Sequence, residues 1–440
     1  MRRLRPSDDG DFRTRHGTWR RQLLLASGAA LLTAACGAGE ERSDRDGDED
    51  GHGDGRSGRV PAPDGALGAN VNEDPGGLRL AQLRALSAGW LRGFVPVPEA
   101  DRGPVEQQPS VAALLRAHRH GYGTVLSLKF PYRDQALPRP GTARMAAELA
   151  RVEKIAHAVL GSVDILVIGN EPFLESRTDE RDGPAVNLFY EHVARHLIAY
   201  RARRFPERSG KSAGGGADRR TGEGGGARLY LGALNHLDRP GRRTGATRRW
   251  LEFARREPEI EGVDIHPHVA SLSAAQQYLD YVVPRLRDDQ RFLATEFSLV
   301  LNWRRHLRDR IPGGFARRYG ADPDTRVWQV LKEAVERPFP QEKWDAFLAM
   351  SPWFHENRHY LRDQVGRFRA TGKLAVATYG VVQAEAMVRD IGPDKQPWLL
   401  NSLYANRTVR TPDGGLPGRN RAWCEDFRAL QRPRDRRPGG

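Results

Sequence analysis

Residues 165–172 read Ile165-Leu166-Val167-Ile168-Gly169-Asn170-Glu171-Pro172, an apolar run of the β type that ends in an amide, a carboxylate and a proline. A second run, Arg291-Phe292-Leu293-Ala294-Thr295-Glu296-Phe297, also places one carboxylate at the end of a short apolar strand. Parallel strands whose C-terminal ends carry the chemistry are typical of α/β barrels. Two glutamates that end two such strands predict a barrel with a carboxylate pair at its mouth.

Short apolar runs of this kind alternate with helix-like stretches through the middle of the chain. Between the runs, apolar residues recur at helical spacing, for example over residues 78–86 and 146–155. Eight strand-to-helix repeats predict an α/β chain folded as a (β/α)8 TIM barrel over residues 64–410. The predicted strands are 66–71, 90–95, 124–130, 164–169, 229–234, 263–266, 292–296 and 374–378.

Other features of this region bear on the architecture. A doubly wound sheet is the alternative, and it is disfavoured because residues 65–70 lack the glycine spacing of a dinucleotide-binding loop. Residues 207–227 contain two Gly-Gly-Gly triplets and predict a disordered loop before the fifth strand. A long insertion, about residues 299–373, is predicted between the seventh and eighth strands.

Composition allows a sizeable core. With 440 residues and 39% hydrophobic residues, the chain is long enough for one large domain with tails or for two ordinary domains. A formal net charge of +14 can indicate nucleic acid or anionic surfaces as partners. The arginines are scattered, however, and no recognition motif accompanies them. We therefore expect no nucleic-acid partner, and we separately expect a monomer.

The N-terminus predicts export. Arg20 and Arg21 precede the short apolar run 22–32, which is followed by small residues and Cys36. This run is too short to cross a bilayer, so residues 1–35 are predicted to be a signal peptide. The paired arginines resemble a twin-arginine signal, and the residues before Cys36 resemble a lipobox, in which the cysteine is acylated. We predict a protein lipid-anchored to the membrane at the cell surface or in the envelope, with ordinary secretion as the alternative.

Polar segments flank the predicted barrel. Residues 36–63 are rich in Asp, Glu, Gly, Ser and Arg, and they predict a disordered linker because they have too little apolar surface to offset the entropy of ordering. Residues 411–440 are predicted to form a polar, basic C-terminal tail. Cys36 and Cys424 are the two cysteines of the chain, so a lipid on Cys36 leaves Cys424 without a disulfide partner.

Two motifs carry a resemblance to a known group of enzymes. Gly169-Asn170-Glu171-Pro172 and Thr295-Glu296-Phe297 resemble the catalytic motifs of clan A, the retaining glycoside hydrolases built on (β/α)8 barrels. The resemblance implies that Glu171 is the general acid/base, that Glu296 is the nucleophile, and that Asn170 contacts the sugar. A retaining mechanism needs two carboxyl groups about 5 to 5.5 Å apart. The implied activity is hydrolysis of O-glycosidic bonds in an extracellular poly- or oligosaccharide, without a cofactor.

Other strand ends extend this resemblance. Arg92 lies in the second predicted strand, where many clan members place an arginine that hydrogen-bonds the nucleophile. His266 and His268 end the sixth, where the clan often has a His or Tyr beside the nucleophile. Tyr379 takes the position of a tryptophan that forms the floor of the site in many relatives. The histidines also fit a metal site, but their spacing offers no clear third ligand, so we expect no metal.

Further polar and aromatic residues follow the strands. We expect substrate contacts from Tyr132 after the third strand, from Asn235 after the fifth, and from Trp303 in the insertion. Satisfaction of loop polar groups explains Tyr132 or Asn235 equally well, and packing of a helical subdomain explains Trp303. Two alternatives to an enzyme also remain, because fold alone does not settle function. One is a barrel that binds carbohydrate without turnover, and the other is a surface lipoprotein that serves as a scaffold.

Overall fold

The computed structural model describes residues 63–71, 74–206 and 226–431. The predicted signal peptide, Cys36 and all but the last residue of the predicted linker lie outside the described residues. Nearly all of the predicted glycine-rich loop, residues 207–225, also lies outside them.

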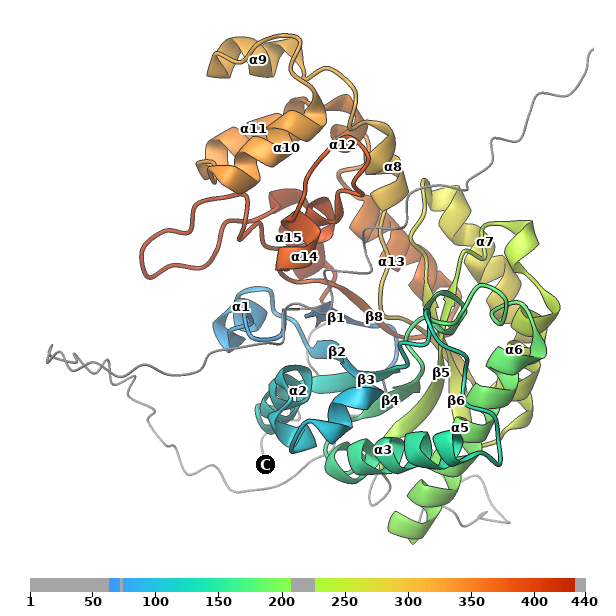
Figure 1. Cartoon of the computed structure of the whole chain (residues 1–440). Helices are drawn as coiled ribbons and strands as arrows, with labels where there is room; N and C mark the ends of the chain where they lie inside the picture. The colour runs from blue at the N-terminus through green and yellow to red at the C-terminus, as the bar shows by residue number, and fades with distance from the viewer. Residues whose placement is uncertain (1–62, 72–73, 207–225, 432–440) are drawn as a thin grey trace, which may run out of the picture. The chain divides into compact units, whose positions relative to one another are not determined.

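Eight parallel strands close into a barrel (Figure 1). They are β1 (Ala66–Asn70), β2 (Trp90–Pro96), β3 (Gly123–Lys129), β4 (Ile165–Ile168), β5 (Arg228–Asn235), β6 (Ile260–His266), β7 (Arg291–Ala294) and β8 (Leu374–Gly380). Each strand pairs with its neighbours in chain order, and β1 pairs with β8 over its whole length. The predicted (β/α)8 barrel is confirmed, because the pairing of β1 with β8 excludes an open doubly wound sheet.

In the part of the barrel interior nearer the N-terminal ends of the strands, the space is filled by side chains that all come from the strands. This buried cluster consists of Trp90, Val125, Ile165, Val167, Tyr230, Leu293, Ala375 and Val376. Because side chains alternate along a strand, Trp90 and Arg92 share one face of β2, and Asp264 and His266 share one face of β6. Arg92, Asp264 and His266 are buried. The interior therefore changes from apolar to polar toward the C-terminal ends of the strands, where barrel enzymes place their sites.

Helices run alongside the strands, as α3, α5 and α6 (green) show in Figure 1. Before β7 they are α1 (Leu80–Ala85), α2 (Pro109–Arg119), α3 (Ala143–Val159), α4 (Pro172–Glu175), α5 (Pro184–Arg204), α6 (Gly245–Arg256) and α7 (Leu272–Val282). Hydroxyl side chains cap three of them, because Thr142, Thr244 and Ser271 each accept a hydrogen bond from a backbone N–H of the first turn. Within the described ranges, no helix has the length and apolarity needed to cross a membrane.

The insertion between β7 and β8 is helical. It comprises α8 (Val300–Arg305), α9 (Gly313–Tyr319), α10 (Val327–Glu336), α11 (Gln341–Met350), α12 (Pro352–His355) and α13 (Tyr360–Ala370). Helices α9 to α12 (orange) stand together away from the strands in Figure 1, whereas α13 packs against α7. Trp303, Trp344 and Trp353 are buried, and the ring centroids of Trp303 and Trp353 lie 5.6 Å apart. Aromatic packing thus forms the core of the insertion.

The C-terminal segment differs from the predicted polar tail. After β8 the chain forms α14 (Glu385–Val388), a 3₁₀ turn η6 (Trp398–Asn401) and α15 (Arg421–Ala429). Trp423 and Phe427 are fully buried, and Trp423 Nε1 donates to the carbonyl oxygen of Leu400 at 2.8 Å. Composition was misleading here because α15 is amphipathic: its apolar residues recur at helical spacing and face the core. Cys424 on the same helix is buried, and it forms no disulfide with any residue that the structure describes.

Candidate active site

Glu171 and Glu296 both follow the C-terminal ends of strands. After β4 the backbone turns at Gly169, where φ is 102°. A Cβ atom on Gly169 would meet the carbonyl oxygen of Gly232 at 2.3 Å, so only glycine fits this close approach. The turn brings Glu171 to the mouth of the barrel. Glu296 arrives there two residues after the end of β7.

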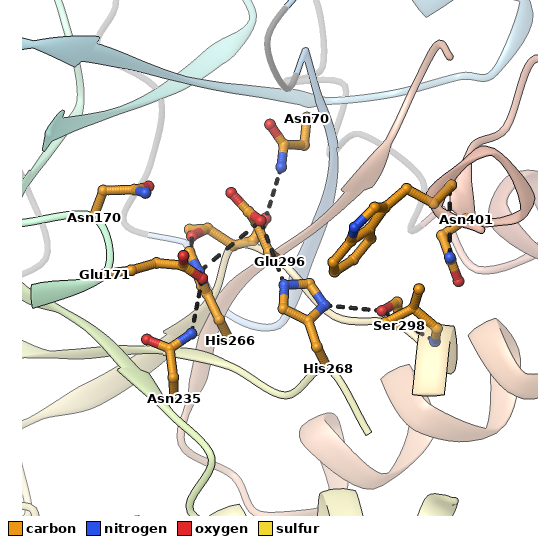
Figure 2. Close-up of polar contacts among 12 residues, drawn as sticks. Asn70, Asn170, Glu171, Asn235, His266, His268, Glu296, Ser298 and Asn401 are labelled. Carbon is orange, nitrogen blue, oxygen red and sulfur yellow. Dashed lines mark hydrogen bonds and ion pairs between the residues drawn. The ribbon is translucent and has the colours of Figure 1, made fainter. Parts of the chain in front are cut away.

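The two carboxylates face each other. Figure 2 shows Glu171 and Glu296 turned toward one another, with the rings of His266 and His268 beside them. One carboxylate oxygen of each glutamate belongs to a group of side-chain atoms that all lie within 4.8 Å of one another. Each glutamate side chain keeps 22% of its surface exposed, so a molecule from solvent can reach both.

Arg92 holds Glu296 from inside the barrel. The arginine is fully buried, and its Nη1 lies 2.5 Å from Glu296 Oε1. Its Nη2 donates to Asn170 Oδ1 at 2.5 Å and to Ser127 Oγ at 3.2 Å. Because a guanidinium only donates, these contacts orient the amide of Asn170. The amide then donates from Nδ2 to Glu175 Oε1 at 2.9 Å.

His266 contacts both glutamates. Its Nδ1 lies 3.1 Å from Glu171 Oε1 and 4.0 Å from Glu296 Oε2. Its Nε2 lies 2.9 Å from Thr295 Oγ1, and that hydroxyl donates to Asp264. Since the hydroxyl has a single proton and gives it to Asp264, it accepts from Nε2–H of His266. Thr295 and Asp264 therefore fix the orientation of the His266 ring on the side away from the glutamates, and Nδ1 is the nitrogen that faces the glutamates.

Asn235 and His268 complete the polar contacts of the pair. Asn235, the last residue of β5, donates from Nδ2 to Glu171 Oε1 at 2.8 Å. His268 Nε2 lies 3.4 Å from Glu296 Oε2, while its Nδ1 lies 2.8 Å from Ser298 Oγ. An isolated bridge pairs the backbones of His268 and Ser298 beyond the ends of their strands. This pairing keeps the imidazole next to Glu296.

The charges in the site depend on one another. Burial raises the pKa of Glu171, but the hydrogen bond and the charge of His266 outweigh it and bring the pKa to about 2. Burial likewise raises the pKa of Glu296, while the charges of His266 and Arg92 hold it well below its usual range. Burial lowers the pKa of His266, but the charge of Glu296 and the contacts with Asp264 and Glu171 raise it to about 10. At neutral pH the site thus holds two carboxylates and a protonated His266.

The same side chains are also suited to a cation. Glu171, Glu296, His266 and His268 each offer one ligand atom, all within 4.8 Å of one another. The sequence-based objection to a metal, that the two histidines lack a third ligand, therefore does not hold. The further ligands are glutamates from β4 and β7, which only the closed barrel brings near β6.

Tyr379 does not face the site, contrary to the prediction. It is 1% exposed, and its ring packs against Phe297 and Trp423 with centroid distances of 5.2 and 6.2 Å. The preceding residue, Thr378, points into the barrel and donates to the carbonyl oxygen of Thr295. Alternation along β8 turns Tyr379 outward into the layer between barrel and helices.

Tyr132 and Trp303 also lie away from the site, so these two predictions are wrong. Tyr132 is 5% exposed and packs edge-on against Phe189, and burial together with the nearby Glu148 raises its pKa above the usual range. Trp303 is fully buried, and its Nε1 donates to Asn401 Oδ1 at 3.0 Å. Both side chains are part of the protein core.

Sequence reasoning missed several residues of the site. Trp398 of η6 is partly exposed, and its ring centroid lies 4.8 Å from that of His268. No local signal marks it, because it follows β8 in an irregular connection. Glu175, one helical turn after Glu171, is buried, and burial raises its pKa. Asp264 could have been found, because it lies two residues before His266 in one strand and therefore shares its face.

Known proteins offer a distant likeness in fold. No family model matches the sequence, and no curated protein matches it. Among solved structures, the chain is similar to a glycoside hydrolase family 30 subfamily 8 xylanase from Clostridium acetobutylicum, with 11% sequence identity and a TM-score of 0.37. The match covers 82% of this chain and 70% of that chain. A likeness of this degree identifies neither a substrate nor an activity.

Proposed function

We propose that this chain is a retaining glycoside hydrolase that cleaves O-glycosidic bonds of a poly- or oligosaccharide. The observation that carries the proposal is that the two carboxylates meet at the barrel mouth, with one oxygen of Glu171 and one oxygen of Glu296 no more than 4.8 Å apart. Retaining enzymes place their carboxyl groups about 5 to 5.5 Å apart, whereas inverting enzymes need roughly 6.5 to 9.5 Å to admit a water. The short spacing supports double displacement.

Glu296 is the nucleophile in this mechanism. It is accessible from solvent, and the charges of His266 and Arg92 keep its pKa well below the usual range, so it is ionised and ready to attack. The attack on the anomeric carbon forms a covalent glycosyl ester while the bond to the leaving oxygen breaks. Arg92 binds Oε1, so Oε2 is the oxygen directed at the sugar.

Glu171 is the general acid and then the base. A general acid must carry a proton when substrate is bound, yet a pKa of about 2 means that this carboxyl is ionised in the free site. The proton instead resides on His266, whose Nδ1 is 3.1 Å from Glu171 Oε1. Its transfer along this hydrogen bond prepares Glu171 to protonate the leaving oxygen. In the second step Glu171 takes a proton from the water that displaces the sugar from Glu296.

Other side chains are placed to hold the sugar. The amide of Asn170 donates one of its two protons to Glu175, and the second can be donated to a sugar hydroxyl. Trp398 presents a partly exposed ring at the edge of the site, where it can stack on a sugar. A small cavity next to Asn235 is lined by Phe173, Leu174, Asp182, Leu234, Asn235, His236, Leu237, Arg242 and Thr247.

Export of the chain as a lipoprotein is a second part of the proposal. It rests on the paired arginines, the short apolar run and Cys36 in the sequence. Radiolabelled palmitate should be incorporated into the wild-type protein in bacterial cells and not into Cys36→Ala. Labelling of both proteins, or of neither, would refute anchoring through this cysteine.

Hydrolysis trials over a panel of aryl glycosides and polysaccharides test the activity. Glu171→Gln should lower kcat by about 10²- to 10⁴-fold, the usual contribution of a general acid/base. The loss should be smallest for aryl glycosides with acidic leaving groups, which need little protonation. Glu296→Gln should lose activity on every substrate. Glu252→Gln, at a site 65% exposed on α6, is the matched control and should match the wild type.

Stereochemistry and rescue test the mechanism separately. The first-formed sugar, followed by NMR, should keep the anomeric configuration of the substrate. Azide should partly rescue Glu296→Ala and give a glycosyl azide of inverted configuration. Full activity in either glutamine variant would disprove the assignment. Binding of a polysaccharide without any turnover would favour the carbohydrate-binding alternative.

A further inference from the structure

We propose that Glu171, Glu296, His266 and His268 form a binding site for Zn²⁺, and that the bound ion blocks hydrolysis. The binding site itself rests on the geometry of the side chains. The blocking effect rests on the proposed function, because it requires that these glutamates cleave the substrate.

The distances between the ligand atoms suit a small tetrahedral ion. Zinc binds imidazole nitrogen and carboxylate oxygen at roughly 2.0 to 2.2 Å, which places neighbouring ligand atoms roughly 3.3 to 3.5 Å apart. His266 Nδ1 lies 3.1 Å from Glu171 Oε1, and His268 Nε2 lies 3.4 Å from Glu296 Oε2. The widest separation in the group is within 4.8 Å.

Both imidazoles are held as metal-binding histidines usually are. Such a histidine gives one ring nitrogen to the ion and uses the other in a hydrogen bond that fixes the ring. His266 donates from Nε2 to Thr295, which donates to Asp264 in turn, and Nδ1, which contacts Glu171 Oε1, would bind the ion after losing its proton. His268 contacts Ser298 Oγ through Nδ1 at 2.8 Å, and Nε2 remains for the ion. In Figure 2, His266 and His268 lie beside the glutamates, with His266 Nδ1 in contact with Glu171 and His268 Nε2 in contact with Glu296.

A divalent cation can take the place of the proton on His266 in the charge balance of the site. Without that proton, two carboxylates face one cation, Arg92, which binds Oε1 of Glu296 and leaves Oε2 for the ion. A mixed set of two imidazoles and two carboxylates suits zinc better than magnesium or calcium, which prefer oxygen ligands. The side chains of Glu171 and Glu296 are each 22% exposed, and that of His268 is 16% exposed, so an ion can enter from solvent.

A bound ion and a reacting sugar exclude each other. Zinc would occupy the oxygen of Glu296 that attacks the anomeric carbon and the oxygen of Glu171 that carries the proton. It would also displace the proton from His266, because a ligating imidazole must be deprotonated. The ion should therefore act as a competitive inhibitor of the sugar.

Calorimetric titration of ZnCl₂ into the metal-stripped, full-length protein tests the binding site. We expect one ion per chain at this site, with no comparable heat from MgCl₂. His268→Gln and Glu296→Gln should each weaken Kd by about 100-fold or more, and Ser298→Ala by about 10- to 100-fold, the usual effect of losing an outer hydrogen bond. His306→Gln is the matched control, because His306 pairs with Asp309 in the insertion.

Circular dichroism should show that every variant is folded. Absence of stoichiometric zinc binding would overturn the proposal, and so would wild-type affinity in both His268→Gln and Glu296→Gln.

The effect on hydrolysis separates this inference from the proposed function. If the protein hydrolyses a glycoside, ZnCl₂ should raise the apparent KM, and EDTA should restore it. Stimulation by zinc would overturn the inhibitory role. If no glycoside is hydrolysed but zinc binds through these residues, the metal site stands and the glycosidase proposal fails. If hydrolysis is robust and zinc neither binds nor inhibits, the metal site fails alone.

Discussion

Arg92 Nη1 lies 2.5 Å from Glu296 Oε1, and the guanidinium is fully buried while the carboxylate side chain keeps 22% of its surface exposed. The ion pair therefore joins the interior of the barrel to the candidate site. Arg92 also donates to Asn170, so one buried cation positions two residues that follow different strands. Because the cation is enclosed, its field on Glu296 is weakly screened by water.

Replacing this cation should impair the nucleophile. Arg92→Met is expected to lower kcat by about 10²- to 10³-fold, the usual effect of removing one preorganised donor, and to raise the pKa of Glu296. The measurement is kcat as a function of pH, together with urea unfolding to confirm a folded variant. Arg308→Met removes an exposed ion pair with Asp394 and should leave kcat unchanged. A wild-type kcat in Arg92→Met would contradict this role.

The proton shared by Glu171 and His266 predicts an unusual pH profile for the metal-free protein. The pKa of Glu171 is about 2 and that of His266 is about 10, so the pair holds one proton between these values. Since kcat/KM reports groups of the free enzyme, it should fall only as the pH rises toward 10. His266→Asn should shift this alkaline limb to lower pH, because Glu171 must then hold the proton alone. An unmoved limb would show that His266 does not hold it.

Trp398 and Trp303 should respond differently to truncation. Trp398→Ala is expected to raise KM with little change in stability, because the ring is partly exposed at the site. Trp303→Ala removes a fully buried ring and should destabilise the fold by about 3 to 5 kcal/mol. Steady-state kinetics and urea denaturation distinguish the two effects. Equal KM values for wild type and Trp398→Ala would remove Trp398 from the site.

The C-terminal helix should contribute to global stability. Trp423→Ala is expected to lower the free energy of unfolding by about 3 to 5 kcal/mol, the cost of emptying a buried tryptophan site. Glu425→Ala on the exposed face of α15 is the control and should stay within about 0.5 kcal/mol of the wild type. Unfolding by urea, followed by circular dichroism, measures both. A stable Trp423→Ala protein would restore the interpretation of this segment as a tail.

Local patterns in the sequence determined the barrel and its two glutamates. Strand and helix periodicities are properties of short segments, so the eight strands were predicted close to their observed bounds. A glutamate just after an apolar run must lie at a strand end, and closure of parallel strands brings such ends to one rim. Glu171 and Glu296 were predicted for this reason. The resemblance to clan A added Arg92, Asn170, His266 and His268, and Asn235 was expected as a polar residue after the fifth strand. The structure brings these seven residues together.

Only the tertiary structure decided which way side chains face and what lies behind them. Tyr379 turns outward because of the register of β8, while Trp398 reaches the site from an irregular connection with no sequence pattern. Asp264, Thr295 and Ser298 orient the two imidazoles through contacts between strands. These contacts orient the rings, and closure of the barrel adds Glu171 and Glu296 to complete the four-ligand group. They depend on separations of a few ångströms between distant segments, which periodicity and composition do not encode.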